Sequence, residues 1–281
     1  MFRFMLAPLE GYTNSVLRTL CFRHGANLTF TEMAHVESFL RGNRQALEKI
    51  AVRDSTPVQI QLLTGKEEHL ESFLRGFEPF PGFEGFNLNL SCPSPDVIKK
   101  GKGAAMIKRA TKTGRLVSII HSHDYKASLK IRLGANAYEK TQKVYLRSLE
   151  MVNADLFVVH AKTAAQESTE NDDYSIYPEC VDVARGIPVI ANGGIDSADK
   201  VRLLLRMGVG GVMIGRAALS NPAIFDTLRN ELGFNEPLKN VPGIELLKGE
   251  YASIHSLIGG EGSYRDAFVS VVGKKVGTPH Y

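Results

Sequence analysis

Strand-like apolar runs alternate along this chain with segments whose apolar residues recur at helical spacing. Eight runs of the first kind are present, at residues 4–9, 27–33, 57–63, 85–91, 127–134, 155–161, 187–194 and 211–217. Segments with apolar residues at i, i+3, i+4 and i+7 separate them, most clearly at residues 15–25, 66–77, 138–152 and 197–208. Such alternation is typical of a parallel sheet covered by helices. Eight repeats therefore predict an α/β protein built as a TIM (β/α)8 barrel.

The pattern changes near residue 233. A proline-containing loop follows, and helical spacing returns in residues 244–260 and 264–276. We therefore expect a barrel domain over residues 1–233 and a small C-terminal helical domain over residues 234–281. The alternative fold is an open Rossmann-like sheet, whose glycine-rich phosphate turn should follow the first strand. The first turn here, LAPLEGYTN, contains one glycine, which favours the barrel.

Composition indicates a globular protein of the reducing cell interior. With 281 residues and 43% hydrophobic content, the chain can bury a large core. The cysteines, Cys21, Cys92 and Cys180, lie far apart, which argues against a disulfide framework or a zinc site. No apolar run approaches the ~20 residues of a membrane span, and the apolar start is too short for a signal peptide. We expect a cytoplasmic protein with no metal and no membrane contact.

Charge is distributed unevenly along the chain. The formal net charge of +4 is compatible with an RNA partner without requiring one. Between Lys99 and Arg115 there are seven basic residues and no acidic residue. Taken alone, this segment is either an ordinary solvated helix face or a surface for a polyanion. The acidic segment at residues 166–174 would have to face away from a nucleic acid.

Polar side chains concentrate where the predicted strands end. In a (β/α)8 barrel, the active site forms at the C-terminal ends of the strands and in the loops that follow. Strands two to eight all contribute, with Glu32, Gln61, Asn89, Cys92, Lys130, Arg132, His160, Lys162, Asn192 and Arg216. Any one of these could be a satisfied core residue or a salt bridge at the barrel mouth. Their joint placement predicts a functional pocket.

Glycines mark the ends of the last two predicted strands. Gly193 and Gly194 lie in ANGGI, and Gly215 lies in IGRAAL, each shortly before a predicted helix. Backbone N–H groups and a helix N-terminus can hold an anion there, and Arg216 can add a charge-assisted hydrogen bond. The loops after strands seven and eight often bind phosphate in barrels. This predicts a phosphate-bearing cofactor or substrate, with tight turns as the purely structural alternative.

Lys130 and Arg132 are two residues apart on the fifth strand, so they point to the same face. A lysine inside a barrel mouth should face an anion or an electron-rich group, because an unpaired buried charge is costly. A reduced flavin or a substrate carboxylate would satisfy it, and the sequence pattern does not choose between them.

Six segments, taken in order, resemble the dihydrouridine synthases, FMN-dependent enzymes that reduce uridine in RNA to 5,6-dihydrouridine. These segments are LAPLEGYTNSVLRTLCFRHGANLTFTEM at the start, then NLSCP, LKIRLG, VHAKT, IPVIANGGI and MIGRAALSNPAIF. The resemblance implies a barrel followed by a helical domain that helps to hold RNA. That role would fall to residues 234–281.

The resemblance also implies a cofactor site and a mechanism. NADPH would reduce the flavin, hydride would pass to uracil C6, and Cys92 would donate a proton to C5. A free thiol has a pKa of about 8.5, so Cys92 would be protonated at neutral pH. Asn89 would place the uracil. The residues implied to hold FMN are Ala7, Pro8, Leu9, Gln61, Lys130, His160, Asn192, Gly193, Gly194, Gly215 and Arg216.

Transfer RNA is the expected substrate. Lys99, Lys100 and Lys102 follow Cys92 closely and are predicted to contact RNA phosphates, within a loop that could close over a flipped-out base. Arg132 and Lys162 are further candidates for substrate contact.

Three residues depart from the family pattern. Ser91 stands where glycine is usual, Lys162 where arginine is usual, and Asn87 where aspartate is expected. Two other functions are compatible with the sequence. One is an FMN oxidoreductase similar to dihydroorotate dehydrogenase, and the other is a non-catalytic RNA-binding barrel.

Overall fold

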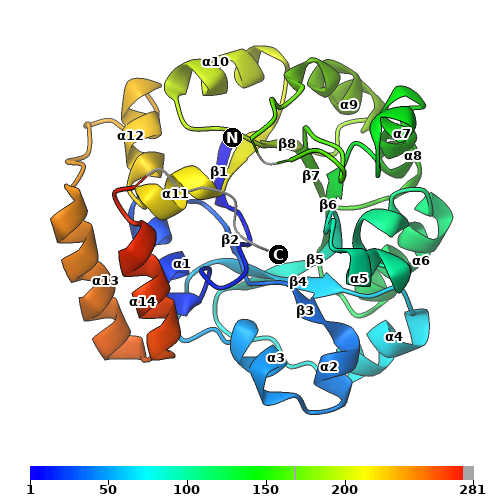
Figure 1. Ribbon diagram of the computed structural model, residues 1–281, viewed down its shortest axis with the longest axis horizontal. Helices are drawn as coiled ribbons and strands as arrows, with labels where there is room; N and C mark the ends of the chain where they lie inside the picture. The colour runs from blue at the N-terminus through cyan, green and yellow to red at the C-terminus, as the bar shows by residue number, and fades with distance from the viewer. Residues whose placement is uncertain (168, 275–281) are drawn as a thin grey trace.

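Within residues 1–167 and 169–274, which the computed structural model describes, nine parallel strands form one sheet that curls into a barrel (Figure 1). β2 and β3 both pair with β4 and share the second of eight strand positions. β1 pairs with β9, and a bridge between Met5 and Leu28 closes the ring, which confirms the predicted barrel. The strands are β1 Arg3–Leu6, β2 Thr29–Phe30, β3 Ala34–His35, β4 Val58–Leu63, β5 Phe83–Leu90, β6 Ala127–Arg132, β7 Leu156–His160, β8 Val189–Asn192 and β9 Gly211–Ile214.

Helices surround the strands and alternate with them along the chain (Figure 1). Two short 3-10 helices, Gly103–Met106 and Tyr174–Ile176, lie in loops at the barrel mouth. The α-helices are α1 Ser15–Arg23, α2 Val36–Leu40, α3 Arg44–Lys49, α4 Glu67–Arg75, α5 Pro95–Lys99, α6 Ala110–Ser122, α7 Ala137–Thr141, α8 Val144–Met151, α9 Tyr177–Val183, α10 Ala198–Arg206, α11 Arg216–Ser220, α12 Ile224–Glu231, α13 Ile244–Ile258 and α14 Gly262–Val271.

The predicted elements are present with shifted ends. The first strand stops at Leu6 instead of residue 9, because the residues after it belong to the loop that lines the mouth. The segment 138–152, predicted as one helix, is divided between α7 and α8. Lys143 lies at the break with φ of +49°, a left-handed conformation that interrupts helical hydrogen bonding.

The barrel interior has two unlike halves. Side chains alternate between the two faces of a strand, so every second residue points inward. From β4, β5 and β6 come polar side chains, each at most 8% exposed, which we call the polar half: Gln59, Gln61, Asn87, Asn89, Ser128 and Lys130. From the strands opposite and the residues adjoining them comes a hydrophobic cluster, which we call the apolar half: Met5, Ala7, Leu28, Phe30, Leu156, Val158, Ile190 and Met213.

The C-terminal helices pack on the outside of the barrel (Figure 1). α13 lies against α1, and Asn14 at the start of α1 donates a hydrogen bond to the Tyr251 hydroxyl at 3.3 Å. Tyr251 stacks on Phe268 of α14, with ring centroids 4.2 Å apart. These contacts tie residues after the barrel to its first helix. The domain boundary at residue 233 and a role in holding RNA stay predictions.

Candidate active site

A pocket of about 640 Å³ opens at the C-terminal ends of the strands. Its volume lies within the range typical of sites for small ligands and cofactors. The structure brings together at its walls these residues proposed from the sequence: Ala7, Pro8, Leu9, Gln61, Asn89, Cys92, Lys130, Arg132, His160, Lys162, Asn192, Gly193, Gly194, Gly215 and Arg216. Lys99, Lys100 and Lys102 are not among its lining residues.

Cys92 lies on the turn after β5 and is 7% exposed. The Asn89 side chain holds this turn, because its Oδ1 atom accepts hydrogen bonds from the backbone N–H groups of Ser91 and Cys92, both at 2.9 Å. Burial raises the pKa of the Cys92 thiol. The thiol is therefore protonated at neutral pH and can act as an acid.

The segment after Cys92 is folded against it. α5 and the 3-10 helix Gly103–Met106 replace the open loop expected from the sequence, and Ala104 N–H donates to the Cys92 carbonyl at 3.0 Å. Gly103 has φ of +56°, and a Cβ atom there would lie 2.8 Å from that carbonyl oxygen. Glycine is required at this position because the backbone approaches Cys92 so closely.

The three lysines of this segment differ in accessibility. Lys99 and Lys100 are exposed, so they remain candidates for RNA contact. Lys102 is 8% exposed, and its ammonium pairs with a Glu37 carboxylate oxygen at 2.6 Å. A contact between Lys102 and RNA therefore requires this ion pair to open.

Lys130 and Arg132 both reach the pocket from β6. The Lys130 ammonium is buried and donates to the Ser91 hydroxyl at 3.4 Å. Burial, together with repulsion from Arg132, lowers the pKa of Lys130 to about 7. Arg132 donates to the Thr163 carbonyl at 2.7 Å, which holds its guanidinium at the wall.

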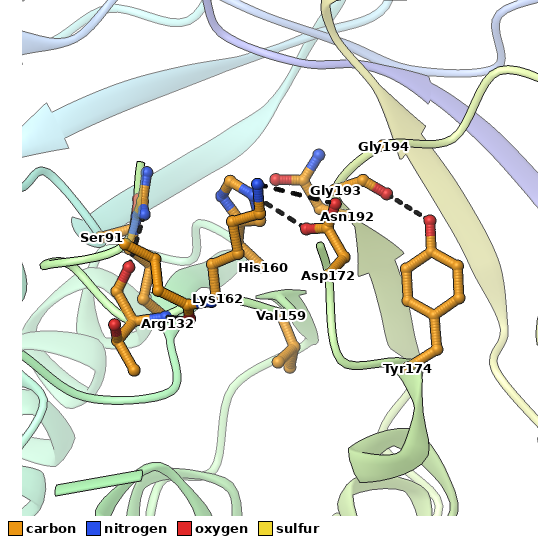
Figure 2. Close-up of polar contacts among 12 residues, drawn as sticks. Ser91, Arg132, Val159, His160, Lys162, Asp172, Tyr174, Asn192, Gly193 and Gly194 are labelled. Atoms are coloured by element: carbon orange, nitrogen blue, oxygen red, sulfur yellow. Dashed lines mark hydrogen bonds and ion pairs between the residues drawn. The ribbon is translucent and has the colours of Figure 1, made fainter. Parts of the chain in front are cut away.

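The glycine loop after β8 has the special geometry its sequence indicated. Gly193 and Gly194 have φ of +118° and +52°, and a Cβ on Gly193 would lie 2.0 Å from an Asp172 carboxylate oxygen. Both conformation and space therefore require glycine here. The Tyr174 hydroxyl donates a hydrogen bond to the Gly193 carbonyl at 2.6 Å (Figure 2). The Asn192 side chain donates to the Met213 carbonyl at 2.8 Å.

Asp172 joins the basic residues of this wall to the glycine loop, as Figure 2 shows. Its carboxylate lies 3.5 Å from His160 Nε2 and 3.9 Å from Lys162 Nζ. Burial raises the pKa of Asp172, while Lys162 and Arg216 act in the opposite direction. Burial also lowers the pKa of His160 well below its usual value, so His160 is neutral at pH 7.

Sequence reasoning missed Asp172 as part of this site. The acidic segment 166–174 was expected only to face away from a nucleic acid, with no part in the pocket wall. The Asp172 side chain is 9% exposed and lies against Gly193. Nothing in the sequence separates Asp172 from its acidic neighbours. Further lining residues that the sequence did not indicate are Glu10, Met33, Ala217 and Ser220 of α11, and Ile224 and Thr227 of α12.

Glu32 follows β2 but does not line the pocket. Its carboxylate is 1% exposed and interacts with Glu10 and with Tyr264 of α14. Burial and then repulsion from Glu10 raise the pKa of Glu32 to about 7. A polar residue at a strand end thus contacts the C-terminal helices instead of the ligand site.

Within residues 1–167 and 169–274, no helix is both long enough and apolar enough to cross a membrane. The same residues contain no group of three or more histidine, cysteine, aspartate or glutamate side chains placed to hold a metal ion.

Comparison with known proteins identifies relatives along nearly the whole chain. Residues 5–273 match the family model of dihydrouridine synthase. The chain is 29% identical over 261 residues to tRNA-dihydrouridine synthase B of Pseudomonas putida, covering 91% of this chain and 77% of that protein. It is 30% identical over 231 residues to tRNA-dihydrouridine synthase B of Xanthomonas campestris pv. campestris, covering 81% and 69%. A probable tRNA-dihydrouridine synthase of Helicobacter pylori is 32% identical over 235 residues, covering 80% and 69%.

Among solved structures, a variant of NCR from Zymomonas mobilis superimposes with a TM-score of 0.52. It is 13% identical in sequence, and the match covers 80% of this chain and 87% of that one. At this identity the likeness shows the fold alone.

Proposed function

The chain belongs to the dihydrouridine synthase family, and we propose that it reduces uridine in transfer RNA to 5,6-dihydrouridine with bound FMN and NADPH as reductant. One observation carries the proposal. A protonated thiol, Cys92, lines the same pocket as the buried Lys130 and the glycine loop at Gly193. The pocket thus combines an acid for the reaction with groups suited to a phosphorylated, electron-rich cofactor. The choice of transfer RNA rests on the relatives, which are named as tRNA-dihydrouridine synthases.

The residues present fit FMN. Gly193 and Gly194 carry no side chain and line the pocket together with Arg216, so backbone N–H groups and a guanidinium could hold a ligand phosphate there. The space that a Cβ atom would need at either glycine is filled by the Asp172 carboxylate. Ala7, Pro8 and Leu9 offer an apolar wall from the first loop. Lys130 would supply positive charge to the electron-rich edge of the flavin.

The chemistry needs a hydride and a proton added across the C5=C6 bond of uracil. When bound, FMN supplies the hydride to C6 after its own reduction by NADPH. Cys92 gives the thiol proton to C5, and its sulfur is then reprotonated from solvent. The nearby positive charges of Arg132 and Lys130 lower the pKa of Cys92 against the effect of burial. They therefore ease release of the proton to the substrate.

The Asn89 side chain is oriented so that its amide N–H can donate a hydrogen bond to the uracil base. Its Oδ1 atom is fully engaged by Ser91 and Cys92, so it is not free to accept from a ligand. One Nδ2 hydrogen goes to Gln61 Oε1 at 2.9 Å, and Nδ2 also lies 3.3 Å from the Met33 sulfur. Because a thioether sulfur is a weak acceptor, this second N–H can instead donate a hydrogen bond to a uracil carbonyl.

Two measurements test the proposal. The purified protein is expected to be yellow, with the absorption bands of oxidised flavin, and NADPH should bleach it. Total RNA from cells lacking the protein should lose dihydrouridine at specific positions that return when the gene is restored.

The alternatives give different results in the same samples. Flavin reduction by dihydroorotate, or reoxidation by orotate at a rate exceeding that with RNA, would favour the dihydroorotate dehydrogenase-like reaction. A colourless protein that FMN does not reconstitute, yet still binds RNA, would overturn the enzyme proposal in favour of a non-catalytic barrel.

A further inference from the structure

The polar half of the barrel contains a chain of hydrogen bonds. It runs from the pocket toward the N-terminal ends of the strands. At the pocket end, Asn89 Oδ1 accepts from two backbone N–H groups, which can only donate. The orientation of the Asn89 amide is therefore determined, and its Nδ2 faces Gln61 Oε1 at 2.9 Å. Gln61 Nε2 in turn donates to Asn87 Oδ1 at 2.8 Å.

Hydrogen bonds at the other end of the chain, near the N-terminal ends of the strands, independently require the same donor-to-acceptor direction. Gln59 Nε2 donates to the Glu84 carbonyl at 3.3 Å, and a carbonyl can only accept. Gln59 Oε1 then accepts from the Ser128 hydroxyl at 2.5 Å, and Ser128 Oγ accepts from Asn87 Nδ2 at 2.7 Å. Every amide between the two ends has one possible orientation. An aspartate in place of Asn87 could not donate to Ser128.

Ser91 links this chain to the pocket. Its hydroxyl donates to Asn89 Oδ1 at 3.3 Å, which leaves the oxygen lone pairs to accept from Lys130 Nζ at 3.4 Å. Within the described part of the chain, Ser91 Oγ is the one hydrogen-bond acceptor found for this ammonium. A glycine at position 91 would remove it.

We propose that Ser91 is a positioning residue that holds the Lys130 ammonium in the pocket, with its hydroxyl kept in the accepting orientation by the chain through Asn89. The inference rests on the proposed flavin site and assigns a role to a residue that the family resemblance does not explain. Lys130 would act on the cofactor, and Ser91 would act through Lys130.

The surroundings of Lys130 disfavour its charged form, so a hydrogen-bond acceptor for the ammonium affects its pKa. The titratable and charged groups that face Lys130 are Arg132 on the same strand, His160 on β7 and Cys92 on the turn after β5. His160 is neutral and the Cys92 thiol is protonated at pH 7, so Arg132 is the charged neighbour and it disfavours a second cation. An acceptor for Lys130 therefore favours the protonated form. At 3.4 Å the hydrogen bond is long, so its effect should be modest.

The test is an FMN titration of the apoprotein between pH 6 and pH 9, followed by quenching of flavin fluorescence. Wild-type affinity should fall as Lys130 loses its proton. In Ser91→Ala the fall should occur at lower pH, because loss of the acceptor lowers the pKa of Lys130. At pH 8 we expect roughly three- to tenfold weaker binding than wild type, with a smaller difference at pH 6.

Two variants separate the hydroxyl from the backbone. Ser91→Thr keeps a hydroxyl and should retain the wild-type pH dependence. Ser94→Ala removes a nearby hydroxyl that makes no side-chain capping bond, and it should also match wild type. The ionisation of the FMN phosphate is common to all four proteins, so it cancels from the comparison.

The outcomes distinguish this inference from the proposed function. If wild type binds FMN and Ser91→Ala shows the same pH dependence, the role of Ser91 is refuted while the flavin site stands. Equal shifts in Ser91→Ala and Ser91→Thr would also refute it, because the hydroxyl would then have no part. Failure of wild type to bind FMN at every pH would refute the flavin site itself.

Discussion

The two halves of the barrel interior fill the same kind of space by different physical means. The apolar half packs methyl and aromatic groups such as Phe30 and Ile190, whose contacts have no required direction. The polar half uses amides and hydroxyls, and each must meet a partner of the correct kind. A directional network of this type fixes which atom each side chain presents at the mouth, whereas apolar packing fixes only shape.

The mouth of the barrel reflects this difference. Above the polar half, the pocket presents reactive side chains, namely Cys92 and Lys130. Above β8 and β9 it presents glycine backbone at Gly193 and Gly215, with cationic side chains beside it. In the proposed reaction, side chains would therefore reach the uracil from one side of the pocket, and glycine backbone would contact the FMN phosphate from the other.

The largest effect is expected at the acid. Cys92→Ala should retain the flavin absorption bands but lower turnover on transfer RNA roughly 10²- to 10⁴-fold, because it removes the proton donor for C5. Single-turnover oxidation of the reduced enzyme by RNA measures this step. Cys180→Ala is the matched control, since Cys180 is fully buried in α9 and does not line the pocket. Full activity of Cys92→Ala would reject the acid role.

The next effect concerns the stability of the two halves. Asn87→Asp places a carboxylate at a position with 0% exposure and removes the donor to Ser128. We expect the free energy of unfolding at pH 8 to fall by about 2–4 kcal/mol. Ile190→Val in the apolar half should cost about 0.5–1.5 kcal/mol. Urea unfolding of both variants measures the contrast, and equal losses would show that the hydrogen-bond chain has no special importance.

A third effect involves Glu32, which belongs to neither half. Its pKa is about 7 in the folded protein against 4.5 for a free side chain, so the folded state binds the proton more tightly. Folding therefore loses stability as pH rises from 4.5 to 7, and the full penalty is present above 7. Glu32→Gln should raise the free energy of unfolding by about 1–3 kcal/mol at pH 8 and change it little below pH 4.5.

Thermal or urea unfolding at pH 4 and pH 8 checks this sign. The exposed residue Glu68 provides the matched control, because Glu68→Gln should have nearly the same effect at both pH values. A gain from Glu32→Gln that is equal at the two pH values would contradict the assignment of a raised pKa to Glu32.

The smallest effect is expected on the surface near the polar half. Lys100→Ala should raise the KM for transfer RNA about two- to fivefold and reduce the slope of log affinity against log salt by about one. Lys126→Ala is the control, since Lys126 is exposed just before β6 begins and so lies at the opposite end of the barrel. Equal effects of both variants would mean that RNA attraction is general and not localised at the mouth.

Much of the fold could be predicted from local pattern. Alternation of strand-like and helical spacing predicted all eight strand positions, because the period of the apolar residues reports which face of each element is buried. The predicted strand ends were less accurate: residues at the barrel mouth such as Gly194 continue the strand pattern in the sequence, but they lie in loops. The break at Lys143 was also missed, since no proline or glycine marks it.

Residues that line the candidate pocket could be identified from the sequence where the residue type itself limits the possible role. Glycines at Gly193 and Gly194 indicated unusual backbone, and a polar residue at a strand end indicated the mouth. The strand-end rule failed for Glu32, which interacts with Tyr264 of α14. No local pattern indicated that Lys102, a predicted RNA contact, pairs with Glu37. In both cases the deciding partner lies in a distant segment that no local pattern names.

The barrel, the glycine turns and the Cys92 thiol follow from the sequence, because they depend on periodicity and on the properties of single residues. The folded chain alone establishes that Asp172 lies against the glycine loop and that Ser91 faces Lys130. It also decided the direction of the buried hydrogen bonds. Those features depend on the register between strands and on which donor meets which acceptor, and both are set only when segments far apart in the chain come together.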